Sequence, residues 1–228
     1  MRRLVLLSGT LLLLAGCREQ PPADDAPESG GPPPPPYNES TMPMPDAPPP
    51  TEARPSVRTD TILIEGMPEP VRLTLFDAGD RLSPAFSTYV PADIEPEWRP
   101  TDIGEGVDFV AHFGDVREPA ARLGYFVYRA GMNRAEVNQA VRSFVAERRP
   151  RGDPDAGQRF PWSLMEMRYE YADEDGDPIL GTIGLGERGG RYFHILVQYP
   201  AEYGDGMGPR VHQIIRHWRW ADGSPLPF

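Results

Sequence analysis

The chain has one cysteine, no lysine and no long hydrophobic run. Cys17 has no second cysteine with which to pair, so the mature protein must be stable without disulfide bonds. The 23 basic residues other than histidine are all arginine, so a lysine nucleophile or a lysine Schiff base is excluded. The formal net charge of -11 argues against nucleic acid as a partner, because a nucleic-acid interface needs a basic face.

The longest apolar run lies near the N-terminus and is shorter than the about 20 residues that a transmembrane helix needs. Two arginines precede it, it covers residues 4–15, and a small residue separates it from Cys17, as in a secretory signal. Residues 14–17 (LAGC) resemble the lipobox of a bacterial lipoprotein signal peptide. The resemblance implies cleavage after residue 16, diacylglycerol on the Cys17 thiol and an acyl chain such as palmitate on its new amine. Two or more acyl chains give a stable membrane anchor.

Arg18 follows the lipidated position, where an aspartate commonly retains lipoproteins in the inner membrane. If the host is Gram-negative, the resemblance therefore implies the outer membrane, on either its periplasmic or its surface face. The membrane itself is thus the expected partner of the lipid on Cys17.

Residues 17–56 are the expected tether between the lipid and a folded domain. Of the 29 prolines, 14 lie between positions 21 and 55, among few apolar side chains. Such a segment cannot bury enough surface to offset the entropy of ordering, so we expect a disordered linker. In the polyproline II conformation it could hold a domain up to about 100 Å from the membrane.

Residues 57–228 are long enough for a single globular domain with its own core. Alternation of apolar and polar residues predicts a series of strands. The predicted strands are residues 61–64, 71–76, 86–90, 107–113, 122–129, 164–171, 179–185 and 192–199, the first two forming a hairpin.

Two stretches have helical periodicity instead. Asn133 and Glu136 predict a capping box for the first helix, which ends before Pro150. The second helix carries an apolar stripe at residues 211, 214, 215 and 218. It is expected to begin near Pro209, with an earlier turn at residues 201–203 as the alternative.

Short turns between the strands predict a largely antiparallel sheet of about six to seven strands, covered by two helices. The expected fold class is α+β. The order of elements over residues 86–220 resembles the PsbP-like α/β/α sandwich, through FSTYVP at 86–91, YPAEY at 199–203 and WRW at 218–220. The chain departs from that pattern by its opening hairpin and by Ile94 in place of a tryptophan. The resemblance implies a binding or assembly role and assigns no functional residue.

Two motifs suggest ligands without completing a site. Residues 184–189 match the dinucleotide pattern G-x-G-x-x-G, but a strand-like pattern follows in place of a helix, so we expect a hairpin turn at 187–190. Asp173, Asp175 and Asp177 alternate as calcium ligands do, but the turning glycine and the closing glutamate are missing. An acidic hairpin tip is expected, with weak calcium binding as the alternative. We expect no metal ion and no cofactor.

The histidines and serines show no catalytic or metal-binding spacing, so we expect no catalytic residue and no enzyme. His112 and His194 lie in predicted strands and could meet in space. Trp218 and Trp220 stand beside arginines and could belong to the core or to an exposed patch for a partner. We expect Trp218 in the core and leave Trp220 open.

Two functions fit this sequence. The favoured one is a lipid-anchored envelope lipoprotein whose non-catalytic domain binds an envelope protein partner or helps an assembly, because a long tether provides reach. The alternative is a carrier of a small or lipidic molecule, with a cleft between the sheet and a helix. A pocket wide enough for a ligand would favour the carrier, and an exposed apolar patch over a solid core would favour the adaptor.

Overall fold

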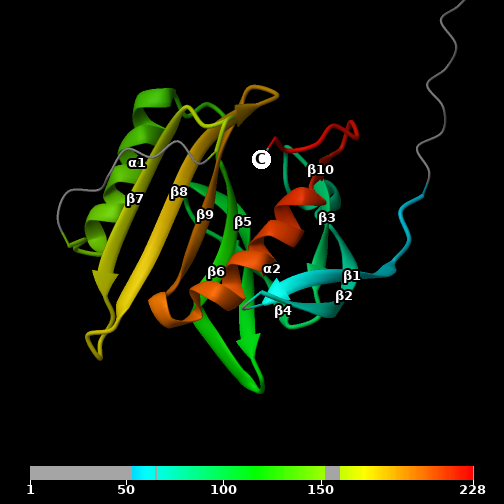
Figure 1. The fold of residues 1–228 in the computed structure, drawn as a ribbon. Helices are drawn as coiled ribbons and strands as arrows, with labels where there is room; N and C mark the ends of the chain where they lie inside the picture. Colours follow the sequence, from blue (N-terminus) through cyan, green and yellow to red (C-terminus); the bar gives the residue numbers. More distant parts are fainter. Residues whose placement is uncertain (1–52, 65, 152–159, 228) are drawn as a thin grey trace, which may run out of the picture. The chain divides into compact units, whose positions relative to one another are not determined.

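The computed structural model describes residues 53–64, 66–151 and 160–227, which form two antiparallel sheets and two α-helices (Figure 1). By its internal contacts the chain divides into Met1–Pro49 and Pro50–Phe228, and all described residues belong to the second unit. Neither helix of this described part is long and apolar enough to cross a membrane.

The larger sheet has six strands among the described residues, in the order β4-β5-β6-β9-β8-β7. These strands are β4 (Ile94–Pro100), β5 (Gly104–Phe113), β6 (Val116–Tyr128), β7 (Met165–Ala172), β8 (Pro178–Arg188) and β9 (Arg191–Pro200). β4 was not predicted, because Pro96 lies inside it. It is an edge strand, where a residue without a backbone N–H is tolerated.

The smaller sheet has four strands in the described part of the chain, in the order β1-β2-β3-β10. These are β1 (Val57–Ile64), β2 (Met67–Asp77), β3 (Phe86–Pro91) and β10 (Arg219–Trp220). β1 and β2 form the predicted opening hairpin, but its strands are longer than expected, since Ile64 already pairs with Met67. Gly66 takes the left-handed φ of 78° that this tight turn requires.

Residues just before β1 contact the smaller sheet, although the sequence analysis placed them in the linker. The Arg54 guanidinium donates to Ser87 Oγ at 2.7 Å and lies 4.6 Å from the centre of the Tyr89 ring. The Tyr89 hydroxyl in turn donates to the carbonyl of Pro55 at 2.7 Å. Among the described residues, contacts with the folded part therefore begin at Arg54.

The two helices cover opposite faces of the larger sheet (Figure 1). α1 (Arg134–Glu147) has the predicted capping box: Asn133 Oδ1 accepts from the N–H of Glu136, whose carboxylate accepts from the N–H of Asn133. α2 (Gly204–Arg216) follows a 3-10 turn at Ala201–Tyr203, so the predicted start near Pro209 is wrong and the alternative of an earlier turn at residues 201–203 is confirmed. Met207 in the first turns of α2 is fully buried, and this packing outweighs the low helix propensity of the glycines around it.

Each face has its own hydrophobic core. The α2 core lies between the larger sheet, α2 and the smaller sheet, and Trp218 is fully buried in it, stacked on Phe86 with ring centres 3.7 Å apart. The α1 core lies between α1 and strands β6, β7, β8 and β9. α1 contributes three fully buried residues to it, Val137, Val141 and Val145.

The α+β class is confirmed, but a single sheet of six to seven strands under two helices is wrong. The strands of the described residues divide between two sheets, because β3 pairs with β2 and β10 and not with the larger sheet. Alternation along a strand identifies the strand and its buried face. It does not identify the neighbours, which are distant in sequence and are selected by packing.

Candidate functional site

Side chains on each strand of the larger sheet alternate between the two cores. On β6, Tyr125 belongs to the α2 core, whereas Phe126 and Tyr128 belong to the α1 core. On β9, His194 is the cross-strand partner of Phe126 and lies on the same face. The face under α1 therefore combines aromatic rings with a buried histidine.

A cleft of about 290 Å³ lies between α1 and this face of the sheet. It is lined by Arg99, Thr101, Asp102, Ile103, Phe126, Tyr128, Ala140, Ser143, Phe144, Glu147 and His194. Apolar walls with a few polar groups are typical of small-molecule sites, and the volume is close to the lower end of their range.

Phe126 forms an aromatic wall of the cleft, and two glycines make room for it. A Cβ on Gly104 or Gly106 would lie 2.8 or 3.0 Å from the Phe126 side chain, so these positions on β5 leave no space for a larger residue. The His194 ring lies 5.2 Å from the Phe126 ring with planes 20° apart, and the Arg99 guanidinium lies 5.1 Å from the ring centre. Guanidinium, phenyl ring and imidazole thus form one layered wall.

His194 is the buried polar group of this cleft, with 4% of its surface exposed. Its Nδ1 lies 2.9 Å from the Tyr128 hydroxyl, and its Nε2 has no hydrogen-bond partner among the described residues. Burial, reinforced by the positive charges of Arg99, Arg148 and Arg122, lowers the pKa of His194 to about 3. The imidazole is therefore uncharged at neutral pH.

Two of these three arginines pair with the same buried carboxylate, that of Asp108. Asp108 Oδ2 lies 2.9 Å from Arg99 Nε and 3.5 Å from Arg122 Nη1. Arg148 instead donates to the backbone carbonyl of Phe144 at 2.6 Å and lies over its ring at 3.5 Å. The surroundings of the imidazole are therefore electropositive, in a protein whose net charge is -11.

The chemistry of this site is suited to binding. A histidine with a pKa of about 3 is a poor general base at neutral pH. Asp102 and Glu147 also line the cleft, so positive potential around His194 is combined with negative charge elsewhere in the lining. Such a site can orient a molecule that has different groups at its two ends.

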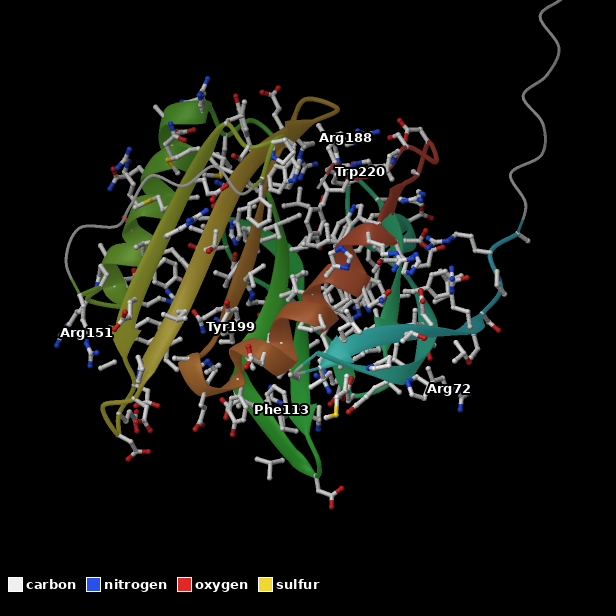
Figure 2. The ribbon with its side chains drawn as sticks, viewed as in Figure 1. Arg72, Phe113, Arg151, Arg188, Tyr199 and Trp220 are labelled. Carbon is white, nitrogen blue, oxygen red and sulfur yellow. The ribbon has the colours of Figure 1, made fainter. Side chains whose placement is uncertain are left out.

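A second depression lies over β7, β8 and β9, toward the α2 side of the larger sheet. Its volume is about 500 Å³, and it is lined by Arg168, Tyr169, Leu180, Gly181, Thr182, Val197 and Tyr199. Tyr199 is labelled in Figure 2, where it lies on β9 beside α2. None of these side chains is a buried polar group without a partner among the described residues, so we name this depression the open groove and regard it as the weaker candidate.

The glycine pattern at residues 184–189 is a hairpin, as predicted. Gly189 and Gly190 form the turn between β8 and β9, with φ of 57° and 71°. Gly184 lies within β8, where a Cβ would come 2.6 Å from the Phe160 ring. Because β9 follows, the loop lacks the helix N-terminus that binds a pyrophosphate.

Asp173, Asp175 and Asp177 lie at the tip of the β7–β8 hairpin, as predicted. Oδ1 of Asp173 accepts from the backbone N–H of Asp175 at 3.0 Å and of Asp177 at 2.8 Å, which stabilises the turn. In the described part of the chain no three His, Cys, Asp or Glu side chains are arranged to hold a metal ion.

The two strand histidines do not meet. His112 Nε2 lies 3.1 Å from the Glu95 carboxylate, toward the far end of β5, whereas His194 contacts Tyr128 under α1. His217 follows α2, and its Nε2 lies 3.3 Å from Asp60 Oδ2.

Both C-terminal tryptophans are buried, so an exposed aromatic patch formed by them is excluded. Trp218 is in the α2 core, as predicted, but its predicted place on the helix is wrong, because α2 ends at Arg216. Trp220 pairs with Phe86 across β10 and β3, and its ring lies 4.8 Å from the Arg188 guanidinium (Figure 2). The Arg188 guanidinium therefore lies over a tryptophan ring that is already buried.

A cleft between the sheet and a helix was the predicted alternative, but neither its helix nor its lining residues were identified from the sequence. Cys17 with its lipobox lies outside the described residues. One signal was available, since Phe126 and Tyr128 fall on the same face of one strand. The register that places His194 opposite Phe126, and the position of α1 above both, depend on long-range packing.

Comparisons with known proteins leave the family open. No family model matches the chain, and no curated protein matches it significantly. One solved structure, LpqN of Mycobacterium tuberculosis, which is described as involved in cell envelope biogenesis, is 14% identical. The likeness covers 65% of this chain and 91% of LpqN with a TM-score of 0.40, which is too low to assign a fold or a function. The resemblance to the PsbP-like sandwich therefore stays a prediction.

Proposed function

We propose that this chain is a lipid-anchored envelope protein whose folded part is a non-catalytic carrier that binds a small molecule in the cleft under α1. The observation that carries the proposal is the cleft of about 290 Å³ between α1 and the larger sheet, with the uncharged imidazole of His194 and the rings of Phe126 and Phe144 in its lining. Besides His194, half of the lining residues are apolar or aromatic, as a small-molecule site requires, and the other half are polar or charged.

The proposal is tested by a substitution whose larger side chain fills the cleft. Ala140 lines it from α1, and Ala140→Leu adds three carbons there with only a small loss of helix propensity. Ala146→Leu is the matched control, because Ala146 is an exposed position of the same helix. We expect fragments selected for binding to the wild-type chain by ligand-detected NMR to bind the Ala146→Leu variant equally and the Ala140→Leu variant at least about tenfold more weakly, a loss of about 1.4 kcal/mol. Equal binding to both variants would place the site elsewhere.

The lipid anchor is tested at Cys17. Cys17→Ser removes the thiol that accepts diacylglycerol, so the protein should lose its acyl mass and leave the membrane fraction. Because Arg18 follows the anchor, we expect the wild-type protein to sediment with outer-membrane markers in a density gradient. Unchanged mass and membrane retention of the Cys17→Ser variant would contradict the lipobox interpretation.

A second candidate function is the adaptor that binds an envelope protein partner, and the tip of the β1–β2 hairpin favours it. Leu63 and Met67 at this tip are 60% and 59% exposed, beside Pro68. Large apolar side chains at one exposed tip can anchor a protein interface. Leu63→Ser should then reduce photo-crosslinking to a partner from position 67, whereas Val116→Ser, at an equally exposed valine (65%), should not.

A further inference from the structure

A depression on the smaller sheet is lined by opposite charges that do not pair with each other. Its volume is about 560 Å³, and its charged lining residues are Arg54, Asp77, Asp80 and Arg219. None of these residues lines the cleft under α1. We name this region the β3–β10 depression, after two of the strands that line it.

The strand register aligns three polar residues across this depression. Ser87 on β3 pairs with Asp77 on β2 and with Arg219 on β10, so the three residues form one row. The neighbouring strand residues Phe86 and Trp220 are buried in the α2 core, so the row lies on the opposite face of the sheet. Because neighbouring strands are about 4.8 Å apart, the backbones at the two ends of the row are separated by about 10 Å.

Two guanidinium groups form the positive side of the depression. Arg54 Nη1 donates to Ser87 Oγ at 2.7 Å, which places the Arg54 head beside the row. Burial lowers the pKa of Arg54, and the positive charge of Arg219 lowers it further, so the two heads are close enough to repel each other. Neither head pairs with a carboxylate within the described residues.

Two carboxylates form the negative side. Asp77 is the last residue of β2, and Asp80 lies in the 3-10 turn that follows. Asp77 Oδ1 accepts from the N–H of Gly79 at 2.8 Å, but neither carboxylate pairs with an arginine in the described part of the chain. Each sign of charge in the depression is therefore available to a ligand, and a molecule that carries both signs satisfies both sides.

The separation of the charges limits the kind of zwitterion. In an α-amino acid a single carbon separates the carboxylate from the ammonium group. In phosphoethanolamine an ester oxygen and two carbons separate the phosphate from the ammonium group, which suits charged side chains that approach each other from strands about 10 Å apart. Arginine is also suited to phosphate, because its planar fork can donate two hydrogen bonds to the phosphate oxygens.

We propose that the β3–β10 depression binds a phosphoethanolamine group, with its phosphate at Arg54 and Arg219 and its ammonium group at Asp77 and Asp80. A phospholipid headgroup and a soluble molecule share this chemistry. Contacts with the folded part begin at Arg54, so the chain that leads to the predicted anchor at Cys17 starts beside this site. The inference goes beyond the proposed function and does not depend on the cleft under α1.

Three soluble probes separate the two sides of the site. Phosphoethanolamine carries both charged groups, propyl phosphate has nearly the same size without the ammonium group, and ethanolamine lacks the phosphate. Titrated into the full mature chain in detergent, phosphoethanolamine should bind at least about fivefold more tightly than either of the others. Equal binding of propyl phosphate or ethanolamine, or no binding of phosphoethanolamine, would overturn the inference.

Two substitutions assign the two sides. Arg219→Gln should weaken phosphoethanolamine and propyl phosphate about fivefold each, whereas Asp77→Asn should weaken phosphoethanolamine alone. Asn keeps an oxygen that accepts from the Gly79 N–H, so this variant decides the question where Arg219→Gln folds poorly. Loss of propyl phosphate binding equal to that of phosphoethanolamine in Asp77→Asn would overturn the inference.

Three control variants change residues outside the depression. Arg72→Gln (Figure 2) and Glu69→Gln remove exposed charges from β2 and should leave all three affinities unchanged. Ala140→Leu should also leave them unchanged. If Ala140→Leu abolishes phosphoethanolamine binding, the probe occupies the cleft under α1, so this inference fails while the proposed function stands.

Vesicles distinguish the two sources of the ligand. The full chain with Cys17→Ser lacks the predicted acyl anchor, so its binding to vesicles measures the site. Stronger binding to vesicles of phosphatidylethanolamine and phosphatidylglycerol than to phosphatidylglycerol alone, reduced by Asp77→Asn, would identify a lipid headgroup. Binding of soluble phosphoethanolamine without vesicle binding would support the same site with a soluble ligand.

Discussion

The two faces of the larger sheet differ in what they bury. The α2 face buries a continuous cluster of apolar and aromatic side chains, including Trp218 stacked on Phe86. The α1 face buries an apolar cluster together with polar groups, among them Asp108, His194 and Gln198. The α2 side also buries polar groups, Glu166 on the larger sheet and Thr88, Gln213 and His217 between α2 and the smaller sheet. Among the described residues of the larger sheet, the α1 face therefore buries three polar residues and the α2 face one, and burial of polar groups costs stability unless they are paired.

Each helix covers only part of its face of the larger sheet. α1 packs on β6, β7, β8 and β9, and the cleft lies beside it, where Arg99 of β4 reaches the face. α2 and the smaller sheet cover the other face, leaving the open groove over β7, β8 and β9. Both faces therefore have a depression next to a helix, but the cleft under α1 is the one lined by a buried, unpartnered nitrogen among the described residues.

The largest expected effect is on the packed face. Trp218→Ala removes a fully buried ring and should lower the free energy of unfolding by about 3 to 5 kcal/mol. Trp98→Ala is the control, because Trp98 is only partly buried on edge strand β4 and should cost less. Chemical denaturation of both variants measures the difference. A Trp218→Ala variant within about 0.5 kcal/mol of wild type would contradict the account of the α2 core.

The next effect tests the ion pairs of the α1 face. Asp108→Asn leaves Arg99 and Arg122 without their carboxylate and should destabilise the protein by about 1 to 3 kcal/mol, less than for a fully buried pair because both arginines are partly exposed. Glu97, the cross-strand neighbour of Asp108, pairs with Arg117 at the surface. Glu97→Gln should therefore cost less than about 0.5 kcal/mol, and equal losses for both variants would show that Asp108 has no special role.

The third effect is the pH dependence contributed by His194. Its pKa is about 3 in the folded protein against 6.5 as the ordinary value, so between these pH values the unfolded chain binds a proton that the folded chain does not. Stability from this residue is complete above about pH 6.5 and falls as the pH falls, by up to about 1.4 kcal/mol per pH unit.

His194→Phe should reduce this slope between pH 6 and pH 4. His217, whose pKa burial also lowers, contributes to the slope that remains in the variant. Denaturation midpoints measured across this pH range test the prediction. A slope that is the same in the wild type and in His194→Phe would show that His194 is not buried uncharged.

The smallest effect concerns the tether. Deleting residues 18–49 should change the unfolding free energy by less than about 0.5 kcal/mol, because their composition leaves little surface to bury. The deletion keeps Arg54, which contacts the smaller sheet. A large drop in the thermal midpoint would mean instead that the tether packs on one of the two faces and covers the depression there.

Local sequence signals predicted most elements and little of their arrangement. The capping box of α1 and the Gly189–Gly190 turn follow from residues that are neighbours in sequence. The division into two sheets follows from β3 pairing with β10, which joins residues 86–87 to residues 219–220. β4 was missed because Pro96 disfavours a strand except at a sheet edge, and edges are not visible before pairing is known.

The candidate site could be predicted even less. Gly104 and Gly106 look like loop or flexible positions until Phe126 is seen beside them. Gly124 has the same character, since a Cβ there would lie 2.6 Å from the Asp108 carboxylate. These glycines make room for side chains of a neighbouring strand, and such a requirement appears only once the register is known.

The most direct test of the central claim is to locate ligand binding on the two faces by amide chemical-shift mapping. The tightest fragment that binds the wild-type protein is titrated into the isotopically labelled chain. We predict that the largest shifts fall on residues lining the cleft under α1, at Ile103, Phe126, Ala140 and His194. Shifts concentrated instead at Leu180, Thr182 and Tyr199 would place the site in the open groove and contradict the account.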